Sequence, residues 1–177
     1  MKEEIENEID RAYVAGFAMG EGCFHIGITS RRRGKKSRLH YTVRPIFVIV
    51  QAEQDSAVLN YVQKVIGFGT IHQSSQHRNR NANNTVLLMI SGVKRCKELI
   101  PLFDKYKLHG QKQVDYDLWK NTITLMDSGA HLTVEGFLKI AELRDQMNLR
   151  GVQGKPNPRY RDVTFFRKFF NANKYTN

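Results

Sequence analysis

Val14-Ala-Gly-Phe-Ala-Met-Gly-Glu-Gly22 is an apolar run with two glycines four residues apart and an acid that lies between its last two glycines. A glycine inside a helix costs about 1 kcal/mol relative to alanine, so this pattern needs an offsetting interaction. Ala12, Gly16 and Gly20 fall on one helical face, where small residues let a second helix pack closely. If the second helix is a copy of the first, two Glu21 carboxylates lie side by side at a two-fold interface and can share divalent metal.

Composition indicates one globular domain over residues 1–177, because the chain has 177 residues and 41% of them are hydrophobic. Lysine and arginine number 28 against 17 acidic residues, which gives a formal net charge of +11. Such an excess makes nucleic acid the first partner to expect. A generally basic protein is the alternative, and the placement of the charges must decide between them.

The two cysteines, Cys23 and Cys96, have no spacing typical of a zinc site or a disulfide framework, and we expect both to be buried thiols. No apolar run approaches the roughly 18 to 20 residues that span a bilayer. The acidic segment Met1–Asp10 is unlike a signal peptide. We therefore expect a soluble intracellular protein without a membrane partner, in an organelle (mitochondrion or chloroplast) or a prokaryotic cytoplasm.

Hydrophobic periodicity predicts a helix over about residues 11–20 with Asp10 as its N-cap, then a strand over residues 23–29. A basic turn over residues 31–38 leads to a return strand over residues 39–44. Pro45 is expected to disturb the pairing before an apolar strand over residues 46–51. The result is a hairpin with a basic tip and a basic face.

The same order then repeats along the chain. The pattern predicts a helix over residues 55–66 that ends at Gly67, two strands over 70–75 and 85–91, and a helix over about 93–103. Further helices are predicted over about 113–126 and 133–148, the second with Thr133 as its cap and Glu135 in its first turn. The aromatic run at residues 165–170 is predicted to dock on the body of the protein.

With the nonapeptide 14–22 and this order of elements, the chain resembles the LAGLIDADG homing endonucleases. Segments 112–119 and 132–143 also look like the helices that follow the sheet in that family. The resemblance implies an α+β class and the αββαββα homing-endonuclease fold, with an antiparallel saddle-shaped sheet over the DNA major groove plus C-terminal helices. It places the core at about residues 10–148 and a C-terminal tail at 149–177. Because the motif occurs once, the resemblance implies a homodimer joined through Ala12, Gly16 and Gly20.

The resemblance assigns the metal site to the end of the motif. Glu21 would bind the metal and Gly20 would contribute a backbone carbonyl. The sequence departs from the family name at Met19, and glutamate in place of aspartate at position 21 is a familiar variant. Mg²⁺ is the expected cofactor, because it is a hard ion that accepts few protein oxygens. The alternative without a function is that Glu21 is a solvated acid beside a helix end.

Two further catalytic residues are implied by the resemblance. Gln51 aligns with a position that orders water near the scissile phosphate, although a polar residue that closes a strand is often only a surface residue. Lys112 matches a basic residue that reaches toward the active site, where a cation stabilises developing charge. Lys107 and His109 compete with Lys112 for this role, and a generic lysine at a helix start is the bland alternative.

DNA contacts are expected on the polar face of the sheet. Side chains with a period of two along the first hairpin can meet base edges, whereas its tip more naturally meets phosphates. The second hairpin extends this surface, and a solvated face is the alternative for any single residue. The predicted DNA-binding set is Arg31, Arg32, Arg33, Lys35, Lys36, Arg38, His40, Thr42, Arg44, His72, Ser74, Gln76, Arg78 and Arg80.

These features predict a Mg²⁺-dependent, site-specific endonuclease that hydrolyses phosphodiester bonds of double-stranded DNA at a long, near-palindromic target. An intron maturase is one alternative, and only that alternative requires RNA as a partner. A non-catalytic DNA-binding regulator of the same fold is another, and it would be favoured if Gly20 and Glu21 were degraded, which they are not.

Overall fold

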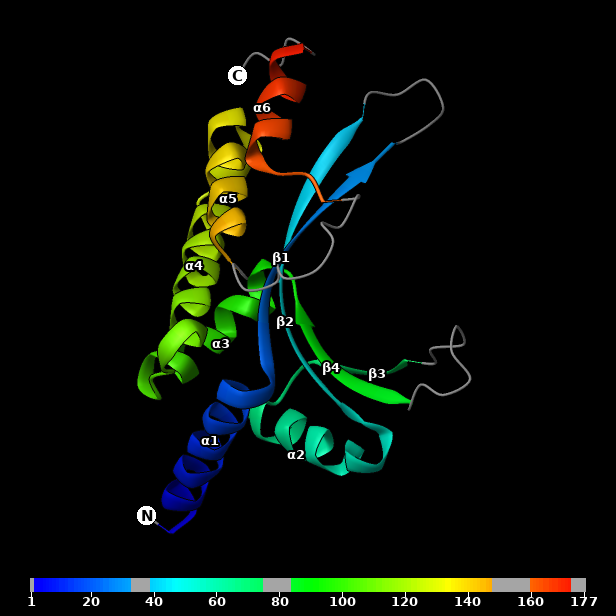
Figure 1. Cartoon of the computed structure of the whole chain (residues 1–177). Coiled ribbons are helices and arrows are strands. Elements are labelled where there is room, and N and C mark those ends of the chain that lie inside the picture. Colours follow the sequence, from blue (N-terminus) through cyan, green and yellow to red (C-terminus); the bar gives the residue numbers. More distant parts are fainter. Residues whose placement is uncertain (1, 33–38, 75–83, 148–159, 173–177) are drawn as a thin grey trace. The chain divides into compact units, whose positions relative to one another are not determined.

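The protein has an α+β fold, as the sequence predicts. The computed structural model describes residues 2–32, 39–74, 84–147 and 160–172 (Figure 1). The principal elements are α1 (Lys2–Glu21), β1 (Gly22–Arg31), β2 (His40–Ala52), α2 (Ser56–Ile66), β3 (Thr70–Ser74), β4 (Thr85–Ser91), α3 (Val93–Lys105), α4 (Gly110–Asp127), α5 (Val134–Gln146) and α6 (Val163–Ala172). The order αββαββα is therefore confirmed. Within the described ranges, no helix is both long enough and apolar enough to cross a membrane.

The four strands form one sheet in the order β1-β2-β4-β3. Strand β4 pairs antiparallel with β2 on one side and with β3 on the other. The chain divides into two compact units, of which unit 1 comprises residues 1–24 and 46–113 and unit 2 comprises residues 25–45 and 114–177. Strands β1 and β2 each contribute residues to both units.

Unit 1 has its core between one face of its strands and the helices α1, α2 and α3 (Figure 1). Alternate residues of β2 and β4 point into this core, and Phe47, Ile49 and Leu88 are fully buried. The rings of Phe24, Phe47 and Phe103 have centroids 5.1 to 5.4 Å apart. Both predicted strands of the second hairpin are confirmed, and so are the predicted helices α2 and α3.

The first helix is longer than the sequence predicts, and the N-cap assigned to Asp10 is wrong. Helix α1 begins at Lys2, so Asp10 lies inside it. Tyr61 donates a hydrogen bond to the Asp10 carboxylate at 2.5 Å. Lys105 forms an ion pair with Glu8 at 2.8 Å, which lowers the pKa of Glu8, and Tyr106 donates to the Glu8 carbonyl. These contacts with α2 and the end of α3 stabilise the first turns of α1, which have no apolar stripe of their own.

Unit 2 contains the docking segment that the sequence predicts. Helix α6 places Phe166, which is 1% exposed, against Tyr41 of β2 and Phe137 of α5 at 5.0 and 5.1 Å between ring centroids. The predicted cap of α5 is also confirmed, because the Thr133 hydroxyl accepts a hydrogen bond from the backbone N–H of Gly136 at 3.0 Å.

Two expectations about the strands are corrected. Strand β2 runs unbroken through Pro45, and its pairing with β4 begins one residue later at Ile46, so the proline removes no donor from that ladder. Cys23 is exposed, whereas Cys96 is buried as predicted. Cys23 alternates with the buried Phe24 along β1 and therefore points away from the core.

Candidate active site

The candidate site is built at the point where α1 ends and β1 begins. Glu21 is the last residue of α1 and is exposed, and the strand starts at the next residue, Gly22. A Cβ atom on Gly22 would lie 2.6 Å from the Ala18 carbonyl oxygen and 2.9 Å from the ring of Phe47. Glycine is therefore required at position 22, and the sequence analysis gave it no role. The sequence signal that could have identified this position is a glycine directly after the acid that ends the helix.

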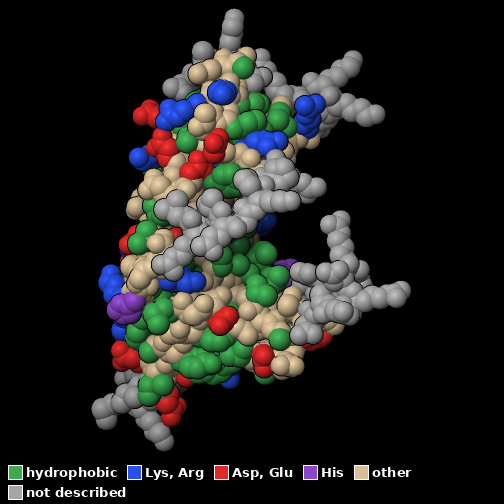
Figure 2. All heavy atoms as spheres, viewed as in Figure 1, with side chains coloured by type: hydrophobic (Ala, Val, Ile, Leu, Met, Phe, Trp, Pro, Cys, Tyr) green, Lys and Arg blue, Asp and Glu red, His purple; other side chains and the backbone are tan. Residues whose placement is uncertain are grey.

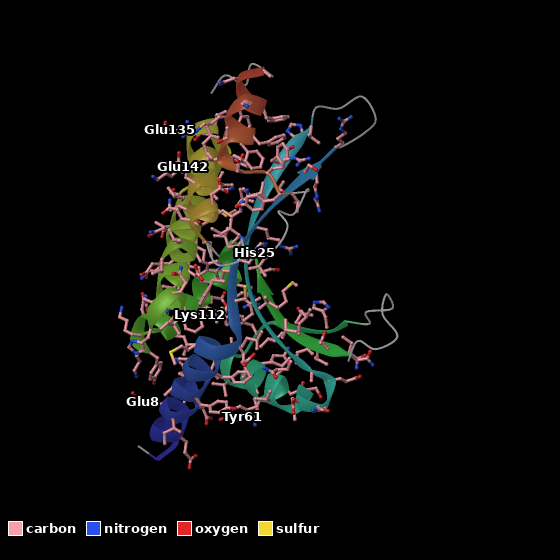
Figure 3. All side chains as sticks on the ribbon, viewed as in Figure 1. Glu8, His25, Tyr61, Lys112, Glu135 and Glu142 are labelled. Carbon is pink, nitrogen blue, oxygen red and sulfur yellow. The ribbon has the colours of Figure 1, made fainter. Side chains whose placement is uncertain are left out.

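Lys112 reaches this junction from a distant part of the chain. It lies in the first turn of α4, and its Nζ donates a hydrogen bond to the backbone carbonyl of Gly22 (Figure 3). The bond places a lysine ammonium one residue from Glu21. Lys107 and His109 are exposed and precede α4, and among the described contacts neither has a hydrogen bond to the junction. The geometry therefore favours Lys112 among the three candidates, and its catalytic role stays a prediction.

The junction supplies oxygen donors for a metal ion. Glu21 offers a carboxylate, Gly20 offers a backbone carbonyl, and both residues are exposed. Over the described ranges, no three His, Cys, Asp or Glu side chains come together as a metal-binding group. Glu21 alone does not complete the coordination of a divalent ion, so a bound ion would take further ligands from a second copy, a phosphate or water. Oxygen donors of this kind suit Mg²⁺.

One face of α1 is bare. Ala12, Gly16 and Gly20 are all exposed, and a Cβ atom at either glycine would have nothing within 4 Å. The same face carries three large apolar side chains that are exposed by 62%, 47% and 42%, namely Ile9, Tyr13 and Met19. The described part of the chain therefore provides no helix that packs against these small residues.

Gln51 has a different setting. It is partly buried, pairs with Val86 of β4, and lies on the side of β2 that also carries Phe47 and Ile49. No hydrogen bond in the described ranges joins it to Glu21 or Lys112. Its role in ordering water stays a prediction.

Part of the predicted DNA-binding set lies on β1 and β2 in unit 2. His40, Thr42 and Arg44 are exposed and alternate with the half-buried Tyr41 and Val43, as the sequence predicts. The hydroxyl oxygens of Thr42 and Thr29 are 3.0 Å apart, so both side chains lie on the same side of the hairpin.

The rest of the set is more scattered. Arg31 and Arg32 are exposed at the end of the first strand, His72 is exposed on β3, and Ser74 ends β3. Seven of the predicted residues lie outside the described ranges: Arg33, Lys35, Lys36, Arg38, Gln76, Arg78 and Arg80.

His25 adds a polar group to β1. It keeps access to solvent, but the surrounding protein removes part of its hydration, and this burial lowers the pKa of His25. The guanidinium of Arg144 lowers it further. Arg144 is itself 8% exposed and lies over the ring of Tyr160 at 4.5 Å. Burial and the hydrogen bond to Asp145 raise the pKa of Tyr160 to about 12.

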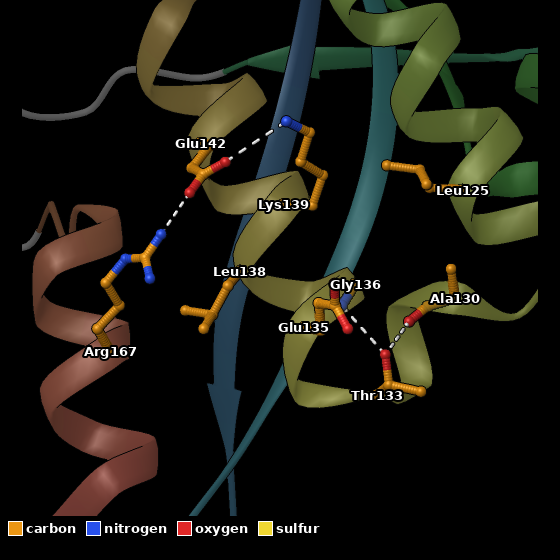
Figure 4. A pocket seen from close by; sticks show the side chains of 9 residues that line it. All are labelled: Leu125, Ala130, Thr133, Glu135, Gly136, Leu138, Lys139, Glu142 and Arg167. Atoms are coloured by element: carbon orange, nitrogen blue, oxygen red, sulfur yellow. Dashed lines mark hydrogen bonds and ion pairs between the residues drawn. The ribbon is translucent and has the colours of Figure 1, made fainter. Parts of the chain in front are cut away.

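Unit 2 also contains a cavity of about 700 Å³ between α5 and its neighbours (Figure 4). Three of its charged side chains pair with one another, since Glu142 pairs with Lys139 at 3.6 Å and also with Arg167. Thr133 is occupied in capping α5. The cavity contains none of the predicted site residues, and its groups form surface ion pairs and a helix cap rather than a catalytic arrangement.

Comparison with known proteins identifies the family. Residues 14–123 match the family described as LAGLIDADG endonuclease. The chain is 31% identical to "Probable intron-encoded endonuclease 2" of Neurospora crassa over 135 residues, which are 76% of this chain and 26% of that protein. The chain spans about a quarter of the length of the first curated relatives that it matches.

Two solved structures extend the comparison. The crystal structure of the homing endonuclease I-TnaI superposes with a TM-score of 0.69 and 29% identity, and the match covers 92% of this chain and 96% of that one. The LAGLIDADG meganuclease I-AabMI, solved bound to uncleaved DNA, superposes with a TM-score of 0.66 and 29% identity over 78% of this chain and 44% of that one.

The close approach at Gly22 makes a direct prediction. Replacing Gly22 with alanine should lower the free energy of unfolding by about 1–3 kcal/mol, because the added methyl group meets a backbone oxygen and a buried ring that cannot move freely. Urea unfolding followed by circular dichroism measures the change. The neighbouring exposed Cys23→Ala should stay within about 0.5 kcal/mol of wild type. Equal stability of Gly22→Ala and wild type would contradict the packing described.

Proposed function

This chain belongs to the LAGLIDADG endonuclease family, and from that membership we propose that it is a metal-dependent, site-specific endonuclease of double-stranded DNA that acts as a homodimer. The observation that carries the proposal is the hydrogen bond from Lys112 to the carbonyl of Gly22. It holds a lysine ammonium on the residue that follows Glu21, whose exposed carboxylate ends a helix that has a bare face. The intron-encoded relative supports a role in intron homing, and this origin fits work in an organelle or a prokaryotic cell.

Glu21 is the proposed metal ligand, together with the carbonyl of Gly20. A divalent ion such as Mg²⁺, when bound there, would supply an activated water and stabilise charge on the phosphate and the leaving oxygen. The exposed position of Glu21 leaves its carboxylate open to phosphate from one side. With Glu21 as the proposed carboxylate ligand of each chain, the proposed site takes a second carboxylate from the Glu21 of the partner copy.

Lys112 is proposed to stabilise negative charge that develops on the scissile phosphate. A lysine ammonium has three N–H donors. The Gly22 carbonyl accepts from one of them and fixes the position of the nitrogen, so the other two remain for a phosphate oxygen or water. A cation that is held in place before the reaction needs little reorganisation during it. Gln51 is proposed to order water, as the resemblance implies.

The bare face of α1 is the proposed dimer interface. Gly16 and Gly20 leave room for a second backbone, and packing of a second α1 would offset the cost of two glycines in a helix. A two-fold axis between the helices brings together the two Glu21 residues, one for each DNA strand. Two-fold symmetry of the protein also requires a target with two related half-sites, which makes the target near-palindromic.

Glu21→Gln should abolish DNA cleavage and retain DNA binding, because the amide keeps the size of the side chain but loses the charge that holds the metal. Cleavage of a plasmid library with Mg²⁺ and binding of the same DNA without it are the two measurements. The exposed Glu135→Gln on α5 is the matched control and should cleave like wild type. Undiminished cleavage by Glu21→Gln would exclude the proposed metal ligand.

Lys112→Met should lower the single-turnover cleavage rate by about 10²–10³-fold, the usual effect of removing one preorganised charge-stabilising donor. Affinity for DNA should change little. Lys107→Met removes the same charge from a side chain that does not contact Gly22, and it should cleave at nearly the wild-type rate. If the two variants lose activity in the reverse order, Lys107 is the catalytic lysine.

Gly16→Leu should convert the dimer to a monomer of 20.5 kDa, because a large side chain prevents the close approach of two helices. A single chain has space for it, since nothing lies within 4 Å of the added Cβ. Sedimentation equilibrium measures the mass, and circular dichroism checks that the fold is kept. Ala57→Leu, an exposed site on α2, should remain dimeric. A dimer that tolerates Gly16→Leu would place the interface elsewhere.

A further inference from the structure

One face of the sheet in unit 1, which no described helix covers, has an unusual composition. Strand register places six side chains in two rows across β2, β4 and β3, with Val50, Leu87 and His72 in one row and Val48, Met89 and Thr70 in the next. We call Val48, Val50, Leu87 and Met89 the apolar panel. The sequence analysis expected a polar surface on the sheet and did not identify this panel.

The panel is open to solvent and separate from the core. Val50 is 44% exposed, and the other three members are half-buried. Their strand neighbours Phe47, Ile49 and Leu88 point to the opposite side and are fully buried beneath the helices. Figure 2 shows hydrophobic side chains gathered over β2 and β4 beside a histidine. These four side chains therefore contribute to a surface rather than to the packing of unit 1.

This part of the sheet carries no ionic charge. Residues 46–52 of β2, 70–74 of β3 and 85–91 of β4 include no Lys, Arg, Asp or Glu. In unit 2, by contrast, the exposed positions of β2 are His40, Thr42 and Arg44. Positive side chains bind phosphates and bring no sequence information by themselves, whereas base edges are recognised by hydrogen bonds and apolar contacts. A surface without cations is suited to bases rather than to phosphates.

Resting on the proposed endonuclease function, we propose that the apolar panel recognises thymine through its C5-methyl group, with Val50 and Leu87 as specificity-determining residues. The DNA segment that this panel faces is then rich in A·T pairs. The thymine methyl is the apolar group that base pairs of unmodified DNA present in the major groove. An exposed Val or Leu side chain is complementary to it and to no other group there.

His72, the third member of the first row, supports recognition of base edges by this face of the sheet. The imidazole of His72 can donate an N–H to the N7 atom of a purine, but adenine and guanine both carry N7. His72 alone therefore cannot distinguish A·T from G·C. The adjacent Val50 and Leu87 can, because only an A·T pair brings a methyl group to them. A row that combines one donor with two apolar side chains fits a base pair better than it fits an entirely apolar protein partner.

The same chemistry separates DNA from RNA. Uracil lacks the methyl group, so a uracil base gives the panel no apolar contact. The proposal therefore favours a DNA target over an RNA of the same sequence, and it makes deoxyuridine the natural probe.

The test starts from duplexes that the wild-type homodimer selects from a random library in the absence of divalent metal. Each thymine of a selected target is replaced singly by deoxyuridine, which removes the methyl and keeps the hydrogen-bonding edge. At the positions that the panel contacts, the dissociation constant should rise about fourfold per methyl, the value expected for burial of one methyl-sized group.

Two variants connect this effect to the panel. Val50→Thr keeps the shape of the side chain and replaces one of its two methyls with a hydroxyl, so the uracil penalty should become smaller at the position that Val50 contacts. Val114→Thr is the matched control, because Val114 on α4 is 48% exposed and does not belong to the sheet. It should keep the full penalty at every position.

The possible outcomes distinguish failure of the thymine-methyl contact from failure of the proposed endonuclease function. Specific binding with no uracil penalty at any thymine, or a penalty that Val50→Thr leaves unchanged, would overturn the methyl contact and leave the endonuclease proposal intact. Failure to select any duplex would overturn both. A penalty that is smaller in Val50→Thr and retained in full in Val114→Thr would establish that the panel recognises thymine.

Discussion

The absence of a side chain at Gly22 is the constraint on which the site depends. Helix α1 runs directly into β1, and the junction lies so close to the Ala18 carbonyl and the Phe47 ring that no Cβ fits. Because the chain turns here without a loop, Glu21 is held at the end of a helix rather than on a mobile connection. The carbonyl of the same glycine accepts the hydrogen bond from Lys112. One residue therefore fixes the position of both charged groups of the candidate site.

Most of the fold could be predicted from local patterns, because alternation in the strands and apolar stripes in the helices identify the elements that bury one face. The Thr133 cap of α5 and the docking of Phe166 were predicted in this way. The first two turns of α1 were missed because their helical state depends on distant partners, among them Tyr61 and Lys105. Propensity and capping patterns contain no information about such contacts.

The candidate site could be predicted in part, because one of its residues belongs to a local sequence motif and the other does not. Glu21 stands inside a motif, so its place followed from the motif alone. The choice of Lys112 over Lys107 required the structure, because three basic residues within six positions differ only in which of them reaches Gly22. The apolar panel was missed because Val48 and Val50 resemble core residues in sequence, and only the pairing of β2 with β4 shows that they face away from the helices.

A single subunit leaves two surfaces without the partners that their residues fit. Gly16 and Gly20 each cost α1 about 1 kcal/mol relative to alanine, and the empty space around them means that nothing in the described chain offsets this cost. The panel likewise leaves Val50 exposed to water and its three other apolar side chains partly so. Natural selection of stability alone would replace these residues with alanine and with polar side chains. Their presence is explained if the first surface packs against a second copy and the second packs against DNA. The two surfaces then have separate effects, since the first sets the spacing of the two Glu21 residues and the second selects which bases lie beneath the sheet.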